Sequence, residues 1–202
     1  MVEIKAIVFD IGGVMASENN MKNHYIPLCN ALKINKKDFF NVRNKYMPLA
    51  SSGKITGKKL ISLFAKELNQ DYNKFYKNWI KYKIMSTKKN YKLEKLLNKI
   101  KNKYVLASLS GVIDLHQKIY AKKGIYNVFE FNIYSFKAGY HKPHIKLYQL
   151  ALKRLKLTPQ EVVVVDNAQD CLNVARKLGI HTILFKNNKQ LVRDLRKLGV
   201  KI

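Results

Sequence analysis

Cysteine is scarce in this 202-residue chain. Cys29 and Cys171 are the only two, they lie far apart, and no CxxC pair occurs. This pattern excludes a disulfide framework and a cysteine-based zinc site. We therefore expect both thiols to be packed in the interior.

Long apolar runs are also missing. Hydrophobic residues make up 47% of the chain, yet no run approaches the roughly 18 residues that a membrane span needs. The N-terminus carries Glu3 and closes its short apolar run with Asp10, so it lacks the basic start and longer apolar segment of a signal peptide. The sequence predicts a cytoplasmic protein with no membrane partner, built as one domain or one domain plus a small insert.

Acidic residues are few: 13 stand against 39 basic ones, for a net charge of +26. Such a field attracts phosphates and nucleic acid. Only five of the basic residues are arginine, and the lysines are scattered, whereas a folded nucleic-acid binder usually clusters its charge on one face. A genome rich in A/T codons also favours Lys and Asn. We expect a solvated basic surface in preference to a nucleic-acid site.

Short apolar runs bounded by polar residues are what the chain does contain. They read as buried parallel strands and lie at 5–9, 104–108, 161–165 and 181–185, with a further strand expected near 130–135. Apolar residues at helical spacing, such as Leu93 and Leu97, separate these strands. Strands that alternate with helices predict an α/β fold with a doubly wound parallel sheet.

Residues 18–87 have a different texture, with no β-branched run and many aromatic residues at helical spacing. We predict a helical domain over 18–87, inserted into an α/β domain formed by 1–17 and 88–202. Most of its aromatic side chains should form the insert's own core: Phe39, Phe40, Tyr46, Phe64, Phe75, Trp79 and Tyr82.

Polar residues follow several of the predicted strands. Asp10 ends the first strand, Ser110 follows the second and Asp166 follows the third, while Lys142 lies in a loop after the strand near 130–135. Because ligands bind outside the carboxyl ends of the strands in an open α/β sheet, these side chains should converge at one edge.

Four segments carry a resemblance to a known family. They are "VFDIGGV", "SLSGVIDLH", "GYHKPHIKLY" and "VVVVDNAQDCLNVARKLGI", and they span residues 7–185. In this order and spacing they resemble the motifs of haloacid dehalogenase (HAD) superfamily hydrolases, in the subfamily with a helical cap at the first insertion position. The resemblance implies a Rossmann-like core, with the cap inserted after the first strand. Ser110 fits the second motif better than Ser108.

The resemblance implies a phosphatase that acts on a small phosphorylated metabolite. Asp10 takes the position of the covalent nucleophile, Lys142 that of the lysine that clamps the nucleophile and the phosphoryl charge, and Ser110 that of the hydroxyl donor. The residues implied in phosphate binding are Gly12, Gly13, Ser110, Gly111 and Lys142, with the glycines letting backbone donors approach closely.

The implied cofactor is Mg²⁺, which prefers oxygen ligands and keeps several waters. Its expected ligands are Asp10, the Gly12 carbonyl, Asp166 and Asn167. Many relatives have a second Asp in place of Asn167, so the loss of one negative charge should lower metal affinity.

A further departure lies two positions after the nucleophile, where most family phosphatases have a second Asp that protonates the leaving group. Here that position is Gly12, although a branch that resembles sugar-1-phosphate phosphatases shares this glycine. Loss of general acid–base assistance costs on the order of 10²–10⁴-fold in rate. Glu18, His116 or water could replace the acid; otherwise Glu18 is a hinge residue and His116 lies on a helix surface.

His141 and His144 form an i, i+3 pair. Zinc would need further ligands that are not near in the sequence, so a helix start at His144 is the better interpretation.

Two other functions stay open at this point. One is a degenerate HAD fold that serves as a binding or regulatory module for nucleic acid or an acidic partner. The other is a metal-free 2-haloacid dehalogenase, since those relatives also lack the second Asp. They usually carry an Arg in a loop on the cap side, and this chain has no Arg before Arg43. The protein could be a monomer or a homodimer.

Overall fold

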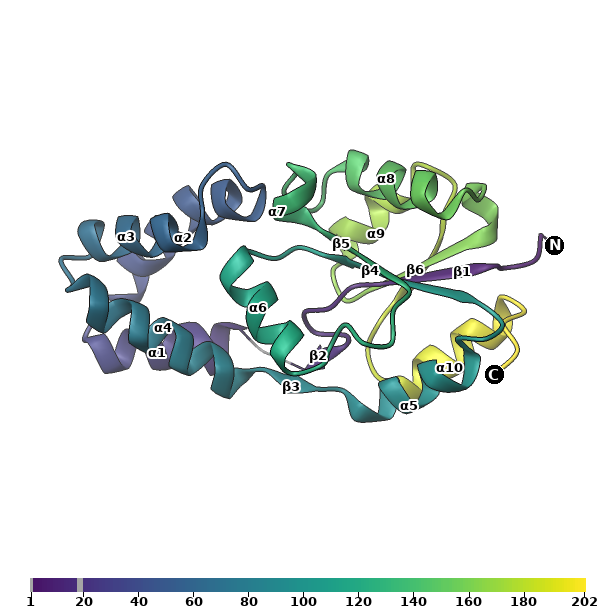
Figure 1. The fold of residues 1–202 in the computed structure, drawn as a ribbon, viewed down its shortest axis with the longest axis horizontal. Coiled ribbons are helices and arrows are strands. Elements are labelled where there is room, and N and C mark those ends of the chain that lie inside the picture. The colour runs from purple at the N-terminus through teal and green to yellow at the C-terminus, as the bar shows by residue number, and fades with distance from the viewer. Residues whose placement is uncertain (1, 18–19) are drawn as a thin grey trace.

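Five parallel strands form the centre of the molecule, which we describe from a computed structural model that covers residues 2–17 and 20–202 (Figure 1). The sheet order is β5-β4-β1-β6-β7. The strands are β1 (Ala6–Phe9), β4 (Val105–Ser110), β5 (Phe131–Tyr134), β6 (Val162–Asp166) and β7 (His181–Leu184). Each of the five predicted runs contains or overlaps one of these strands.

The central strands are buried on both faces. Every residue of β1 and β6 is buried, and the side chains on the two faces belong to two separate hydrophobic clusters. Because β-branched residues suit a pleated strand covered on both sides, the valine run of β6 takes a central place.

Helices cover both faces of this sheet, so the predicted doubly wound α/β fold is confirmed. Figure 1 shows α8 (Ile145–Leu155) and α9 (Gln169–Arg176) on one side and α5 (Tyr91–Ile100) and α10 (Asn188–Lys197) on the other. The remaining helices of this part are α6 (Asp114–Lys122), α7 (Ser135–Ala138) and the single turn η2 (Pro159–Glu161).

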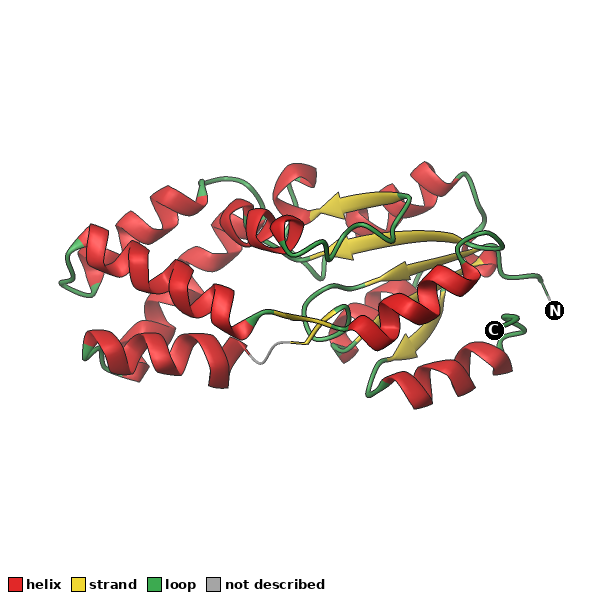
Figure 2. Ribbon diagram, turned by 60° about the horizontal axis from the view of Figure 1, so that its bottom comes forward, coloured by secondary structure: helices red, strands yellow, loops and turns green. Residues whose placement is uncertain are grey.

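A helical lobe lies between β2 (Ala16–Ser17) and β3 (Lys88–Lys89), which pair with each other antiparallel (Figure 2). Its helices are η1 (Asn20–Tyr25), α1 (Ile26–Leu32), α2 (Lys36–Ser51), α3 (Gly57–Glu67) and α4 (Tyr72–Ser86). The starts of α2, α3 and α4 are fixed by Asn35, Thr56 and Asp71, whose side chains accept hydrogen bonds from backbone N–H groups of the first turn.

Aromatic packing holds the helical lobe together. Phe39, Phe64, Phe75 and Trp79 are fully buried in one hydrophobic cluster; Phe40, Tyr46 and Tyr82 pack against it while partly exposed. The rings meet in tilted and edge-to-face pairs, for example Phe64 and Trp79 with centroids 5.4 Å apart. The lobe therefore has its own core, as the aromatic spacing predicted.

The lobe and the α/β part are joined by direct contacts. Asp114, the first residue of α6, accepts a hydrogen bond from the backbone N–H of Gly57 at 2.8 Å, so a carboxylate of the α/β part caps helix α3 of the lobe. Ile113 and Leu115 extend the lobe's hydrophobic cluster.

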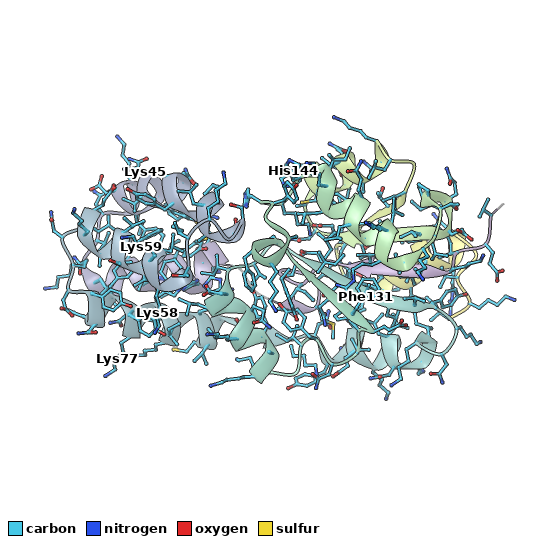
Figure 3. All side chains as sticks on the ribbon, turned by 45° about the horizontal axis from the view of Figure 1, so that its top comes forward. Lys45, Lys58, Lys59, Lys77, Phe131 and His144 are labelled. Atoms are coloured by element: carbon cyan, nitrogen blue, oxygen red, sulfur yellow. The ribbon has the colours of Figure 1, made fainter. Side chains whose placement is uncertain are left out.

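Both cysteine thiols are free and buried, as predicted. Among the described helices, none is both long and apolar enough to cross a membrane. Exposed lysines such as Lys45, Lys58, Lys59 and Lys77 project from three different helices of the lobe (Figure 3).

Candidate active site

The carboxyl edge of the sheet brings together residues from three adjacent strands. Asp10 follows β1 directly, and its backbone N–H donates to the Val165 carbonyl of β6 at 2.8 Å. Ser110 ends β4 and Asp166 ends β6. All three side chains are buried or nearly so.

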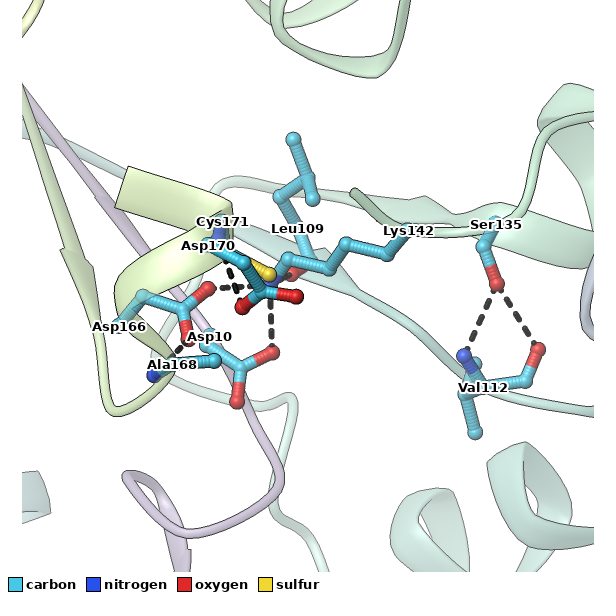
Figure 4. A network of polar contacts seen from close by, with 9 residues as sticks. All are labelled: Asp10, Leu109, Val112, Ser135, Lys142, Asp166, Ala168, Asp170 and Cys171. Atoms are coloured by element: carbon cyan, nitrogen blue, oxygen red, sulfur yellow. Dashed lines mark hydrogen bonds and ion pairs between the residues drawn. The ribbon is translucent and has the colours of Figure 1, made fainter. Parts of the chain in front are cut away.

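Lys142 joins two of these side chains. Its Nζ lies 2.7 Å from Asp10 Oδ1 and 2.6 Å from Asp166 Oδ2, and it also donates to the Leu109 carbonyl at 3.1 Å (Figure 4). A buried ammonium between two carboxylates is a charge arrangement that persists only when each member is paired. The structure thus places one cation between the predicted nucleophile and the predicted metal ligand.

Burial and charge act in opposite directions on this cluster. Burial raises the pKa of Asp10 to about 6, with the Lys142 charge opposing the shift and the Asp166 charge adding to it. Burial acts to lower the pKa of Lys142, but the charges of Asp10 and Asp166 together hold it well above its usual value. Lys142 is therefore a permanent cation, and Asp10 can be ionised at neutral pH.

Two glycines make room for side chains of the site. At Gly13, where φ is 89°, an added Cβ would lie 2.5 Å from Asn167 Nδ2. At Gly111 it would lie 3.2 Å from Lys142 Cβ, against the stem of the lysine. Each glycine lets a functional side chain reach the sheet edge.

The predicted role of Gly13 in phosphate binding needs a correction. Its backbone N–H donates to the Ala16 carbonyl at 2.7 Å, within the turn that follows Asp10, so it is already used. Gly13 also lies outside the cavity, whereas Gly12 lines it. The conformation of the turn, which the sequence alone does not specify, accounts for the difference.

A cavity of about 320 Å³ opens at this edge and lies between the α/β part and the lobe. The α/β part contributes Asp10, Gly12, Ser110, Gly111, His141, Lys142, Asp166 and Asn167, among others. The lobe contributes Tyr25, Arg43, Met47 and Ser51. The predicted site residues other than Gly13 therefore share one cavity.

The lobe residues were not predicted from the sequence. Arg43 and Ser51 lie on α2, and Ser51 Oγ contacts His141 Nδ1 across the boundary between the two parts. No local motif marks these positions, because only the packing of α2 against the sheet edge brings them to the cavity. Asp170, four positions after Asp166, also lines the cavity and was missed; the available signal was a second acid shortly after the one that ends β6.

His116 is not a helix-surface residue, contrary to one of the two interpretations made from the sequence. It is 7% exposed, lines the cavity, and its Nε2 accepts a hydrogen bond from Trp79 Nε1 at 3.0 Å. Burial, with help from the Lys83 charge, lowers its pKa well below the usual value. A neutral imidazole with one nitrogen already accepting a bond is a poor proton donor. Glu18, the other candidate acid, lies outside the described residues.

The structure also bears on the choice between Ser108 and Ser110 and on the roles of His141 and His144. Ser108 Oγ donates to Asn132 Oδ1 at 2.6 Å, away from the cavity lining, whereas Ser110 lines it. His144 begins helix α8, and its side chain accepts from the Lys146 backbone N–H. In the described ranges no group of three or more metal-ligating His, Cys, Asp or Glu side chains gathers.

The oxygen donors of the site fit Mg²⁺ better than zinc. Mg²⁺ is commonly held by one or two carboxylates while it retains waters, and the residues Asp10, Gly12, Asp166 and Asn167 all border one cavity. Asp166 Oδ1 accepts from the Ala168 backbone N–H at 2.9 Å, which fixes the orientation of this carboxylate.

Comparison with known proteins agrees with this geometry. The family model described as haloacid dehalogenase-like hydrolase matches residues 7–185. The chain belongs to this family. The match spans all four segments that carry the HAD resemblance.

The individual relatives match different fractions of this chain. Bifunctional epoxide hydrolase 2 of Sus scrofa is 39% identical over 75 residues, which is 37% of this chain and 14% of that protein, so only a small part of that relative is matched. A HAD-family enzyme of Bacteroides thetaiotaomicron in complex with magnesium and inorganic phosphate superposes with a TM-score of 0.72 at 23% identity, covering 91% of this chain and 94% of the other. For L-2-haloacid dehalogenase of Xanthobacter autotrophicus with covalently bound chloropropionic acid, the TM-score is 0.66 at 19% identity, covering 96% and 83%. These two likenesses show the shared fold.

Proposed function

We propose that the protein is a Mg²⁺-dependent phosphatase that hydrolyses a small phosphorylated metabolite through an aspartyl-phosphate on Asp10. The observation that carries the proposal is the Lys142 ammonium held between Asp10 and Asp166 at the wall of a 320 Å³ cavity. The helical lobe acts as the cap in this proposal, with residues 1–17 and 88–202 as the core and 18–87 as the cap. The phosphate and magnesium bound to the Bacteroides enzyme support the choice of substrate and cofactor.

The chain's own residues would act as follows. A carboxylate oxygen of Asp10 forms the bond to phosphorus while the bond from phosphorus to the leaving oxygen breaks. Lys142 offsets the negative charge that the phosphoryl oxygens bring next to Asp10, and the Ser110 hydroxyl and backbone N–H groups near Gly111 hold the remaining oxygens. A water then hydrolyses the acyl phosphate and releases inorganic phosphate.

Asp10, the Gly12 carbonyl, Asp166 and Asn167 would hold Mg²⁺. When bound, the ion neutralises phosphoryl charge and orients the transferred group. Lys142 already engages one oxygen of each carboxylate, so it would keep the two acids close together without the ion.

The missing acid at Gly12 limits the substrate range. Burial lowers the pKa of His116 well below its usual value, which makes His116 a poor replacement for this acid and keeps Glu18 and water as the other candidates. Slow hydrolysis of alkyl phosphates and faster hydrolysis of esters with acidic leaving groups should follow.

The first test is hydrolysis of para-nitrophenyl phosphate at low salt, with and without Mg²⁺. This substrate has a good leaving group, so it requires the nucleophile and the metal but not the acid. We expect release that needs Mg²⁺ and is lost in Asp10→Asn. Asp194 on α10 is a partly exposed carboxylate that does not line the cavity, so Asp194→Asn is the control variant and should keep full activity. Equal release by wild type and Asp10→Asn would overturn the proposal.

A 2-haloacid dehalogenase is the second candidate, because Arg43 lines the same cavity as Asp10. Asp166 does not separate the two functions, because a second carboxylate could hold Mg²⁺ in a phosphatase or activate water in a metal-free reaction. Halide release from 2-chloropropionate in the presence of a chelator would support this function. Salt-sensitive RNA binding that is unchanged in Asp10→Asn, without any hydrolysis, would instead indicate a binding module.

A further inference from the structure

Arg43 is a cation of the helical lobe that faces the same cavity as the nucleophile. It lies on α2, and the cavity that it lines also contains Asp10 and Lys142. The guanidinium carbon lies 5.2 Å from the centre of the Tyr25 ring, which supports one of its flat faces. The side chain therefore occupies a defined position at the wall of the cavity.

The guanidinium of Arg43 has a buried N–H donor that lacks an acceptor in the described part of the chain. One terminal nitrogen donates to the side chain of its neighbour Asn44 at 3.2 Å. Its Nε is buried and has no hydrogen-bond partner, and within the described ranges no carboxylate forms an ion pair with it. An arginine has five N–H donors in a rigid fork, and here the buried Nε–H is the donor that lacks an acceptor among the described residues.

Among the residues that the structure describes, no carboxylate is paired with Arg43, although three of them line the same cavity: Asp10, Asp166 and Asp170. His141 is the nearby titratable group, and the positive charge of Arg43 adds to burial in lowering its pKa. Asp10 and Asp166 in the same cavity are already paired with Lys142. A partly buried cation without a counter-ion is costly, so this wall of the cavity favours an anionic ligand.

The transferred phosphoryl group bonds to Asp10, and Lys142 already offsets its charge there, so we assign Arg43 to a different anionic group. A second anion at Arg43 would belong to the other end of the same small molecule. A cavity of about 320 Å³ is near the lower end of typical ligand sites, which suits a phosphomonoester with a short carbon skeleton. The planar fork matches a carboxylate in two-point contact.

We propose that Arg43 is a specificity-determining residue that binds a carboxylate of the substrate, so that the physiological substrate is a small phosphorylated carboxylic acid. This inference rests on the proposed phosphatase function and adds the class of substrate to it.

The test compares 3-phosphoglycerate with glycerol 3-phosphate, which differ only by a carboxylate in place of a neutral CH₂OH group. We expect kcat/KM to favour 3-phosphoglycerate by about 10- to 100-fold, the range expected for a charge-assisted hydrogen-bonded pair. Arg43→Met should remove this preference, and Arg43→Lys should keep only part of it. Arg154 on α8 is exposed and also lies over an aromatic ring, that of Phe131 at 4.5 Å, so Arg154→Met is the matched control and should leave the preference unchanged.

Binding of the two compounds to Asp10→Asn, measured by calorimetry with Mg²⁺, separates this inference from the proposed function. Tighter binding of 3-phosphoglycerate that depends on Arg43 would support the carboxylate site even if turnover is absent. Equal kcat/KM and equal binding for the two compounds would overturn it. So would a preference that survives in Arg43→Met, or stronger selection of a bisphosphate of similar length.

Discussion

The α/β part and the helical lobe are built by different means. The α/β part uses short β-branched strands and places a polar residue at the end of each central one, so its chemistry lies at a sheet edge. The lobe uses aromatic rings around Trp79 and contributes cavity residues from the side of a helix. In the α/β part a residue reaches the cavity because it ends a strand, whereas in the lobe a residue reaches it because of how its helix packs.

The largest expected effect lies in the α/β part, in Lys142→Met. The change removes the cation between Asp10 and Asp166 and leaves two buried carboxylates facing each other. We expect kcat for para-nitrophenyl phosphate to fall by about 10³-fold or more, as for loss of a charged group that stabilises the transition state. Steady-state kinetics checks this, and Lys146→Met on the nearby helix α8 serves as the control. Retained activity would show that the lysine is not needed.

Trp79→Ala is the matching change in the lobe. Trp79 is fully buried among four aromatic rings and donates to His116, so its loss should lower the free energy of unfolding by about 3–5 kcal/mol. Urea denaturation followed by circular dichroism measures this. Trp79→Phe keeps most of the packing and should cost clearly less. A small effect of Trp79→Ala would mean that the lobe does not depend on this cluster.

Gly12→Asp restores the acid that most family phosphatases carry. We expect hydrolysis of alkyl phosphates to rise by about 10²-fold, the lower end of the benefit of general acid–base catalysis, while para-nitrophenyl phosphate changes little. The ratio of kcat/KM for the two substrate types is the measurement. No change in this ratio would indicate that another group already supplies the proton.

Acid should destabilise the contact region between the two parts. Burial, with the Lys83 charge adding to it, lowers the pKa of His24 to about 3, while an unfolded histidine titrates near 6.5. Below about pH 6.5 the unfolded chain binds a proton that the folded chain does not, so the stability present above that pH is lost as the pH falls. The slope is up to about 1.4 kcal/mol per pH unit for His24. Urea midpoints between pH 7.5 and 4.5 should fall less steeply in His24→Phe; an identical slope in this variant contradicts the prediction.

The smallest expected effect separates two glycines with similar backbone angles. In Gly13→Ala the new Cβ would lie 2.5 Å from Asn167 Nδ2, whereas at Gly199, with φ of 82°, no atom lies within 4 Å. Both changes should cost about 1–2 kcal/mol of backbone strain, but only Gly13→Ala should also lower activity, by about tenfold, through displacement of Asn167. Thermal unfolding and phosphatase assays on both variants check this. Equal activity in the two would show that the Asn167 position is not critical.

Much of the α/β part could be predicted because its signals are local. The strand runs, the four ordered motifs and the convergence of Asp10, Ser110, Lys142 and Asp166 follow from residues at strand ends and from the rule that parallel strands end at one edge. The roles of these residues, the metal, the cytoplasmic location and the choice between monomer and homodimer stay predictions.

The sequence by itself determined which residues could do chemistry and, through the order of the strands, that they meet at one edge of the sheet. Only the tertiary structure decided that Arg43 lines the cavity, that His116 is buried next to Trp79, and that the Gly13 N–H is used within its own turn. The physical reason is that a strand and its carboxyl end are marked by a local run of residues, whereas the side of a helix that faces a cavity is set by packing against residues distant in the chain.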